Sequence, residues 1–586
     1  MCIRDRVGVR EHDSADPSLR GLDVWVGAVD QDGVDPYAGM VRNTGLIDSS
    51  RGSIVVTGKR IEQNGVLEST TSVNLNGRID VLASFGAVAN PNFDNAGTIG
   101  DGAPIFLPQF TGEVVFGSGS LTRILPDYSS DKAIPGLKLP QNSQVNIDGK
   151  DIELAGGSIL FAPSGDLRIR AGEWTYKDDE SLNRTIFNAD GEIEEALPSA
   201  LRKPFAFTAG IVSIVRGSIV DLSGTPDVFV PLSHSVMDVQ MRGNEFADSP
   251  LQREGGLRAK NLRIDLRKTG VYGGRFWMGT PLGDATGLAN IIERNAAQLT
   301  TRGGNIAIQA GESVNIESGA ELNVSGGYTR NEGGLIQTTR LLRGGNVIDV
   351  ANATPDVLYD GIYSGESQST SLKWGNKKTY RHALAPLGAY TEKEYISGAA
   401  GGSIDITSPQ VGLNGELIGK TITGPKQLNT PTAHSSLAIR FRNEKPVETA
   451  SGIVYVDQIS APPAIVFAPG AGLAIPDKEM GATIVVPSRI FEEEEGGFGH
   501  LTIENKDGSI RIAGEPLVLP VGGSLSLQAT NIDLLSSITA PGGSISATAY
   551  NYSPFLYAEQ VVSEALIGQP APGVVEGTGI IRIGAG

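Results

Sequence analysis

Short runs of alternating apolar and polar residues recur along this chain, separated by glycine. Residues 303–327 read GGNIAIQAGESVNIESGAELNVSGG and contain three such runs, at 305–309, 313–317 and 321–325. In each run the apolar residues occupy every second position, which is the period of a β-strand with one buried face. The pattern indicates short strands with glycine at the corners between them, where a positive φ costs glycine no steric strain.

The same pattern returns far along the sequence. Runs that carry it lie within 144–172, 401–407, 508–514, 522–528 and 542–546, and the segments 217–224 (GSIVDLSG) and 319–326 (GAELNVSG) are two copies of one phrase. Three strands in a unit of ~20–25 residues are typical of one circuit of a parallel β-helix, whereas a β-sandwich needs ~100 residues. We therefore predict an all-β fold, a parallel β-helix (β-solenoid) of roughly 17 circuits with loop and helical insertions. A string of small β-sandwiches is the alternative.

The composition agrees with a narrow tube and excludes several other classes. Glycine accounts for 76 of 586 residues, and aromatic residues, which fit poorly inside such a tube, for only 6%. Glycine does not recur at every third position, which excludes collagen. A single cysteine leaves no disulfide framework and no cysteine-based zinc site. The net charge of −18 argues against a nucleic-acid-binding protein, and no uninterrupted apolar stretch predicts membrane insertion.

The two ends need separate treatment. Residues 1–6 (MCIRDR) resemble translated sequencing-adapter read-through, so we exclude them, and the only cysteine with them, from the fold. No signal peptide follows, and the last residues, GTGIIRIGAG, stop in a strand-like phrase. We expect that the sequence is a fragment, truncated at both ends.

One segment resembles a known family. Residues 41–58, VRNTGLIDSSRGSIVVTG, resemble the late part of the haemagglutination-activity (two-partner-secretion) domain of filamentous haemagglutinin-like large exoproteins. Asn90-Pro91-Asn92 is similar to a motif of that domain, although Phe93 follows it in place of glycine. Three further phrases resemble long outer-membrane proteins of this type from environmental Gram-negative bacteria: DSPLQR at 248–253, GTPLGD at 279–284 and ATPDVLYDGIYSG at 353–365.

The resemblance implies a fold, a location and a function. The β-helix would be right-handed, exported through a partner transporter of the outer membrane, and displayed at the surface of a Gram-negative bacterium or secreted. It would serve as a structural adhesin in cell adhesion or aggregation, without catalysis and without a cofactor, and its partners would be glycans or receptors of host or neighbouring cells. An autotransporter passenger is a second possibility. The absence of cysteine from the remaining chain suits export by threading, which a disulfide would obstruct.

The resemblance and the strand pattern together divide the chain into consecutive parts. We assign residues 7–85 to a secretion-domain-like β-helix and residues 86–286 to a β-helix with irregular insertions. A helical insertion is expected at 287–300, further β-helix at 301–352 and an aromatic-rich insertion at 353–400. The final β-helical part comprises residues 401–586.

The two insertions depart from the strand pattern, and insertions are where solenoids usually bind partners. Residues 288–299 (LANIIERNAAQL) have the apolar spacing of a helix, which would cover part of the rod or cap its strands. The second insertion concentrates six of the 18 tyrosine and tryptophan residues of the chain, and these are candidate glycan or receptor contacts: Tyr359, Tyr363, Trp374, Tyr380, Tyr390 and Tyr395. The alternative is that these rings form a small core that ties a loop to the rod.

The enzymatic alternative is a β-helical polysaccharide lyase or hydrolase. It needs carboxylates, with or without Arg or Lys, converging on one face from neighbouring circuits. The acidic clusters at 177–180, 190–195 and 491–496 lie in turn-like stretches that suggest solvated loops. The five histidines stand singly, and no G-x-S-x-G sequence occurs.

One weak candidate for a calcium site is present. Asp30, Asp32 and Asp35 surround Gly33, as oxygen-preferring calcium requires, but Val41 occupies the position of the distal glutamate. A plain Asp/Gly turn is the alternative, and we predict no other metal site.

Overall fold

The computed structural model describes residues 6–11, 22–27, 39–86, 88–89, 106–178, 184–187, 193–197, 200–242, 246, 249–371, 373–381, 389–428, 431–449, 452–458, 463–468, 483–492, 495–514, 516–563 and 566–584. Strands make up 49% of the chain, helices are few, and the large sheets are parallel, so the all-β prediction is confirmed.

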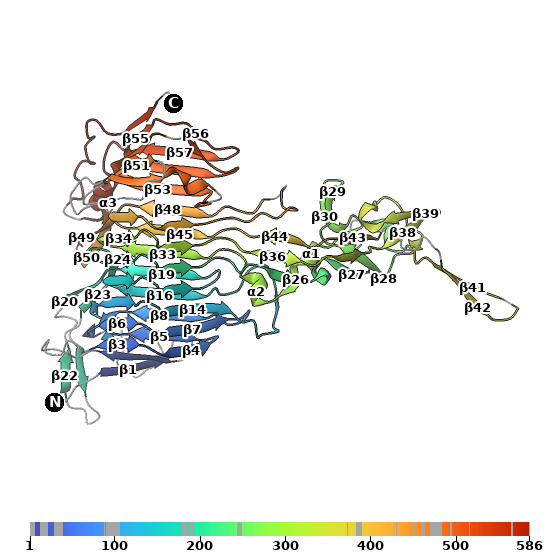
Figure 1. Ribbon diagram of the computed structural model, residues 1–586, viewed down its shortest axis with the longest axis horizontal. Helices are drawn as coiled ribbons and strands as arrows, with labels where there is room; N and C mark the ends of the chain where they lie inside the picture. Colours follow the sequence, from blue (N-terminus) through green and yellow to red (C-terminus); the bar gives the residue numbers. More distant parts are fainter. Residues whose placement is uncertain are drawn as a thin grey trace.

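Three parallel sheets form the main body (Figure 1). The first sheet consists of β3 (Met40–Asn43), β6 (Arg60–Gln63), β13 (Glu113–Phe116), β17 (Asp151–Leu154), β24 (Ile211–Ile214), β34 (Ser313–Ile316) and β46 (Gln410–Leu413). The second consists of β4 (Leu46–Ser50), β7 (Val66–Thr71), β14 (Leu121–Pro126), β18 (Ile159–Phe161), β25 (Ile219–Asp221), β35 (Glu321–Asn323) and β47 (Glu416–Ile418). The third begins with β5 (Ser53–Thr57), β8 (Arg78–Leu82), β16 (Gln144–Gly149), β19 (Asp166–Ala171), β33 (Asn305–Ala310), β45 (Ser403–Thr407) and β48 (Ser436–Arg440).

The chain visits these sheets in a fixed order. β3, β4 and β5 belong to the first, second and third sheet, β6, β7 and β8 repeat that order one strand further along, and so on to β46, β47 and β48. We call one such visit to the three sheets a passage. Each strand pairs in parallel with the corresponding strand of the neighbouring passages. The regular order follows from the glycine-separated runs of the sequence, since each run supplies one strand.

The inward side chains of the three sheets share one hydrophobic core. Ile147, Ile169 and Ile308 lie opposite one another in β16, β19 and β33, and all are almost fully buried. Val314 of the first sheet and Leu322 of the second belong to the same cluster. Aliphatic residues at every second position therefore stack strand upon strand, as their spacing predicts.

The two copies of the repeated phrase lie directly against each other. Val220 of β25 is opposite Leu322 of β35. At the corner that precedes these strands, Gly217 and Gly319 have φ of 83° and 84°, values that favour glycine. The two phrases are similar because each needs a glycine at the corner and apolar side chains on the inward face of the strand that follows.

Fewer passages occur than the expected ~17: the first and second sheets have seven strands each among the described residues. The difference arises from long segments that leave the sheets between successive strands. Apart from two longer segments described below, the strands of these segments are β9 (Ser84–Phe85), β10 (Val88–Ala89), β11 (Phe106–Leu107), β12 (Phe110–Thr111), β15 (Ile134–Pro135), β20 (Glu173–Asp178), β21 (Arg184–Phe187), β22 (Ile193–Leu197), β23 (Ala200–Ala206), β49 (Asn443–Thr449) and β50 (Gly452–Gln458). Near the N-terminus, β1 (Arg6–Glu11) and β2 (Leu22–Gly27) form a separate antiparallel pair; β1 includes Arg6, a residue that we excluded from the fold.

Toward the C-terminus the third sheet alone gains strands among the described residues. Its long strands β53 (His500–Ile512) and β55 (Ser524–Leu534) pair along two stretches separated by a register shift. β51 (Ala464–Ala468), β52 (Thr483–Pro487), β57 (Ser544–Ala549) and β58 (Ile580–Ile583) extend it, while η5 (Ser488–Phe491), β54 (Leu517–Val518), β56 (Ile538–Thr539) and α3 (Pro554–Val562) lie outside it.

Two segments far apart in sequence form a body that projects sideways from the sheets (Figure 1). We call residues 228–299 and 328–398 together the lateral body. The first segment contributes β26 (Val228–Val230), η2 (Leu232–His234), β27 (Val236–Met241), η3 (Pro250–Gln252), β28 (Lys260–Asp265), β29 (Thr269–Tyr272), β30 (Arg275–Thr280), β31 (Gly283–Asp284), α1 (Thr286–Asn290), β32 (Glu293–Arg294) and α2 (Ala296–Leu299). The second contributes β36 (Tyr328–Asn331), β37 (Gly334–Ile336), β38 (Arg340–Arg343), β39 (Asn346–Asp349), η4 (Val350–Asn352), β40 (Gly361–Ile362), β41 (Glu366–Thr370), β42 (Lys377–Arg381), β43 (Tyr390–Glu392) and β44 (Tyr395–Gly398).

The lateral body differs from the sequence assignment in two respects. Residues 328–352, which we had grouped with further β-helix, lie in it. The single helix expected over 288–299 is instead two short helices, α1 and α2, because Glu293 and Arg294 between them pair with β15. Asn295 then begins α2 as one half of a capping box with Gln298.

Candidate binding surface on the lateral body

The lateral body has a hydrophobic core of its own. Leu262 and Ile264 of β28 pack with Leu341 of β38, so the two inserted segments share this core. Tyr359 is only 1% exposed within it, and its hydroxyl accepts a hydrogen bond of 2.8 Å from the backbone amide of Thr354. For this ring the structure supports the alternative interpretation, a core residue.

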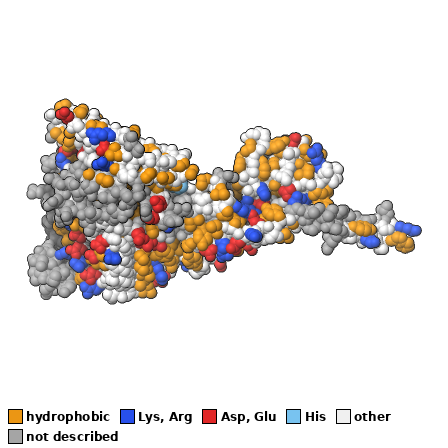
Figure 2. All heavy atoms as spheres, turned by 45° about the horizontal axis from the view of Figure 1, so that its top comes forward, with side chains coloured by type: hydrophobic (Ala, Val, Ile, Leu, Met, Phe, Trp, Pro, Cys, Tyr) orange, Lys and Arg blue, Asp and Glu red, His pale blue; other side chains and the backbone are white. Residues whose placement is uncertain are grey.

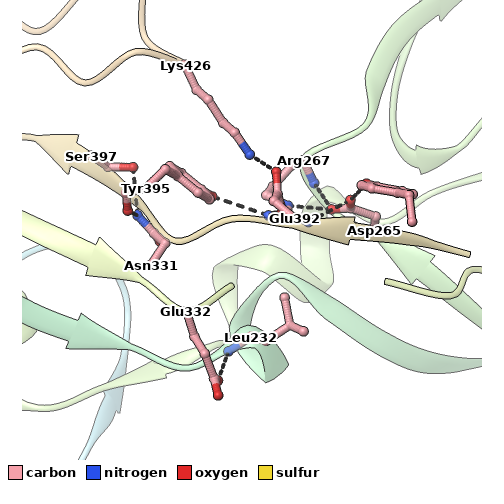
Figure 3. A network of polar contacts seen from close by, with 10 residues as sticks. Leu232, Asp265, Arg267, Asn331, Glu332, Glu392, Tyr395, Ser397 and Lys426 are labelled. Carbon is pink, nitrogen blue, oxygen red and sulfur yellow. Dashed lines mark hydrogen bonds and ion pairs between the residues drawn. The ribbon is translucent and has the colours of Figure 1, made fainter. Parts of the chain in front are cut away.

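A polar network lies where the lateral body meets the loop that follows β47 (Figure 3). Arg267 donates from Nε to Oδ1 of Asp265 at 2.8 Å and from Nη2 to Oδ2 at 2.9 Å. Glu392 of β43 contacts Arg267 on one side and Lys426 on the other. The Lys426 ammonium also lies 3.6 Å from the centre of the Tyr395 ring. Three segments distant in sequence are therefore joined by alternating charges.

The charges in this network shift one another's pKa values. Burial opposes ionisation of Asp265, but the hydrogen bonds from Arg267 outweigh it and hold the pKa of Asp265 below its ordinary value. The partners of Arg267 raise its pKa in spite of burial. Burial, together with the charge of Arg267, lowers the pKa of Lys426. Arg267 and Asp265 therefore stabilise each other in the charged form, as a structural clamp requires.

Two other predicted contact residues belong to this network. Tyr390 is 40% exposed and its hydroxyl donates to Oδ2 of Asp265 at 3.2 Å. Tyr395 is half-buried between Arg267 and Lys426. Tyr363 is also half-buried, and its backbone amide donates to the carbonyl of Arg340 at 2.8 Å. The rings of Tyr390 and Tyr395 therefore help to position the lateral body, whereas Tyr363 is held there through its backbone.

Trp374 and Tyr380 differ from the other four rings. They lie on the hairpin formed by β41 and β42, which pair only with each other among the described strands. Trp374 is 72% exposed and Tyr380 51% exposed. Figure 1 shows the hairpin extending beyond the rest of the lateral body, and in Figure 2 basic and apolar side chains are visible at this far end. The six rings therefore do not form one surface, and two of them lie on an exposed hairpin.

A second exposed apolar surface was not foreseen from the sequence. β29 and β30 form a hairpin in which Val271 is 68% exposed and Phe276 52% exposed. The hydroxyl of Tyr272 on the same hairpin donates to Asp356 at 2.8 Å. The signal was present in the phrase TGVYGGRFW, since two glycines between short alternating runs are typical of a tight hairpin.

A polar cluster covers part of the outer face of the third sheet. Asp80 of β8 accepts from Arg78 and from Asn146 of β16, each at 2.7 Å. One strand further along the sheet, Arg170 of β19 binds Asp148 of β16 through two hydrogen bonds. Burial raises the pKa of Asp80, and nearby Asp148 adds to that effect while Arg78 opposes it. Carboxylates and arginines from neighbouring strands therefore do converge on one face, at residues that the acidic clusters of the sequence did not include.

The remaining sequence candidates are the single histidines, the weak calcium site and the Asn-Pro-Asn motif. His434 and His500 are stacked edge-to-face with 5.8 Å between ring centres, although both stand alone in the sequence. Asp30, Asp32 and Asp35, and likewise Asn90-Pro91-Asn92, fall outside the described residues. In the described part of the chain, no three His, Cys, Asp or Glu side chains are grouped so that they could hold a metal ion. No helix in that part is long and apolar enough to span a membrane.

Comparison of the chain with protein-family models, with curated proteins and with solved structures finds no match in any of the three.

Proposed function

We propose that the main body is a right-handed parallel β-helix. The cyclic order in which the chain visits three parallel sheets supports this interpretation, as does the single core that their inward residues share. The stacking of the repeated phrase at Gly217 and Gly319 fits a tube in which each passage lies on the previous one. The right hand is taken from the resemblance to filamentous haemagglutinin-like exoproteins.

We further propose that the protein is a structural adhesin rather than an enzyme. The observation that carries this proposal is the exposed hairpin β41–β42, which holds Trp374 and Tyr380 in solvent at the far end of the lateral body. Exposed amphipathic rings on a projecting element are suited to contact with another surface. The rod would display this element at a distance from the cell.

The route and the partners of the adhesin rest on the sequence resemblance. The chain would pass through a partner transporter of the outer membrane and remain at the surface of a Gram-negative bacterium, or be secreted. Glycans or receptors of host or neighbouring cells would be its ligands, and the result would be adhesion or aggregation. An autotransporter passenger would present the same hairpin through a different exit route.

An adhesion assay tests this proposal. Beads coated with the purified protein should adhere to cells, and replacement of residues 366–381 by a Gly-Ser turn should abolish adhesion. The matched control is replacement of the β29–β30 turn residues Gly273 and Gly274 by Asn-Gly, which keeps a second hairpin of the same body intact. If beads with the shortened hairpin adhere as well as the unmodified protein, the hairpin is not the contact and the proposal is wrong.

The second candidate function is that of a β-helical polysaccharide lyase or hydrolase. The cluster of Arg78, Asp80, Asn146, Asp148 and Arg170 favours it, because acid–base catalysis on a sugar polymer needs such groups on one face. Against it, Asp80 and Asp148 are only 3% and 5% exposed and already paired. Incubation with pectin and alginate, followed by measurement of product ends, decides between the two. Cleavage that is lost in Asp80→Asn would establish the enzyme.

A further inference from the structure

The tip of the β41–β42 hairpin combines positive charge with a large exposed ring. Lys373, Lys377 and Lys378 are exposed around Trp374, and the turn is completed by Gly375, whose φ is 62°. The ammonium groups of Lys373 and Lys378 lie 5.5 Å from the ring centres of Trp374 and Tyr380, respectively. Three lysines and one tryptophan thus occupy a single convex tip.

The charge of the hairpin is opposite to that of the whole chain. Residues 366–381 contain four basic residues and one acidic residue, whereas the whole chain has a net charge of −18. Each strand of the hairpin has five residues and spans about 17 Å, which exceeds the ~8 Å over which salt screens an exposed charge at physiological ionic strength. The tip is therefore electrostatically separate from the acidic body and can meet an anionic surface.

We propose that this tip binds the headgroup layer of an anionic lipid membrane peripherally. Lysines are attracted to acidic headgroups, and tryptophan prefers the level between headgroups and acyl chains. The inference deepens the proposed adhesin function and rests on it, since it names the partner of the same hairpin.

The shape of the tip favours a lipid surface over a sugar polymer or a folded protein. Specific recognition of a small ligand or a chain usually takes place in a concave site lined by several groups. The tip offers one ring at its turn, and Tyr380 lies further down the strand, opposite Ser367. A fluid layer of headgroups can surround a convex tip from all sides, so Lys373 of the turn and Lys377 and Lys378 of β42 can bind at the same time.

Flotation with vesicles tests the inference on the full chain. At low salt the protein should bind vesicles that contain phosphatidylglycerol but not vesicles of phosphatidylcholine alone. High salt should abolish its binding to the phosphatidylglycerol vesicles. The double variant K377Q/K378Q should lower the partition coefficient by roughly tenfold or more. The matched control K132Q/K138Q removes two exposed lysines that flank β15, outside the hairpin, and should bind as the unmodified protein does.

Tryptophan fluorescence supplies a second measurement. Bilayers with brominated acyl chains should quench part of the emission, and Trp374→Ala should abolish that quenching while circular dichroism stays unchanged. Absence of binding to phosphatidylglycerol vesicles, or equal loss in both lysine pairs, would overturn the inference. Preferential binding of a soluble anionic polysaccharide would also overturn it, because the partner would then be a glycan.

The adhesion assay separates this inference from the proposed function. Cell adhesion that depends on the hairpin without vesicle binding would reject the lipid partner and leave the adhesin proposal in place. Vesicle binding without cell adhesion would reject the adhesin proposal alone.

Discussion

Asp265 accepts two hydrogen bonds from Arg267, of 2.8 and 2.9 Å, where the lateral body meets the loop that follows β47. The Asp265 side chain is 2% exposed and that of Arg267 22% exposed, so the pair is largely removed from water. Glu392 and Lys426 extend the contact to two further segments. This pair therefore helps to hold the lateral body in place, together with charged residues that are distant in sequence and meet only in the folded chain.

The first prediction concerns this pair. Asp265→Asn leaves the Arg267 guanidinium partly buried without its principal partner and should lower the free energy of unfolding of the lateral body by about 2–3 kcal/mol. Hydrogen exchange of β28 and β43 measures the loss. The matched control is Asp238→Asn, which breaks an equivalent two-bond pair with Arg263 that is about half exposed on both sides, so it should cost no more than ~1 kcal/mol. Equal effects of the two variants would contradict the prediction.

The pH dependence of the same pair has a defined sign. The pKa of Asp265 is lower in the folded protein than its ordinary value of 3.8, because Arg267 stabilises the ionised form. The contribution of the carboxylate to stability is therefore complete above the ordinary pKa and is lost as the pH falls through the folded value. The difference in stability between the unmodified protein and Asp265→Asn should be constant near neutrality and disappear in strong acid, as urea unfolding at a series of pH values can measure.

His500 should make the protein less stable in mild acid. Burial lowers the pKa of His500 below 6.5, and the nearby His434 adds to that effect. Because the folded state binds the proton less readily than the unfolded state, stability is complete above pH 6.5 and falls as the pH decreases below it. His500→Asn preserves a hydrogen-bonding group toward Ser524, whose Oγ lies 2.8 Å from the histidine Nδ1. In this variant the melting temperature should depend less on pH between neutrality and mild acid; an unchanged dependence would be the contrary result.

A glycine at a close approach between strands should be indispensable. A Cβ atom at Gly402 would overlap the backbone carbonyl of Gly304, which cannot move without disturbing β33. Gly402→Ala should therefore destabilise the main body by more than ~3 kcal/mol or prevent folding, as thermal unfolding would show. Gly45→Ala is the control, because no atom lies within 4 Å of the added methyl group. A melting temperature for Gly402→Ala equal to that of Gly45→Ala would show that the strands can separate without cost.

Deletions of different length within the aromatic segment should have different consequences. Removal of 359–395 takes away Tyr359 from the core of the lateral body and Glu392 from the polar network, so the lateral body should unfold while the main body remains folded. Removal of 366–381 alone takes away only a hairpin whose strands pair with each other, and the melting temperature should stay unchanged. Limited proteolysis of the two variants measures the difference. Cleavage throughout the lateral body in the variant that lacks only 366–381 would contradict the prediction.

The local periodicity of the sequence was sufficient to predict much of the fold. The runs at 305–309, 313–317 and 321–325 became β33, β34 and β35, and their inward residues Ile308, Val314 and Leu322 are the buried ones. This was possible because alternation and corner glycines are local properties: each strand needs only its own inward face and its own turn. Equivalent phrases stack for the same reason, as Gly217 and Gly319 show.

The tertiary structure alone decided how the insertions are used. The concentration of rings at 359–395 was visible in the sequence, but their different burial was not. Tyr359 is buried in a core with Leu262 and Leu341 from other segments of the lateral body, whereas Trp374 projects into solvent. The polar cluster around Asp80 and Asp148 and the clamp around Arg267 and Asp265 also unite residues through strand register and long-range contact. Sequence periodicity specifies which face of a strand is buried, whereas the partners of an insertion are set by packing between parts of the chain that no local pattern relates.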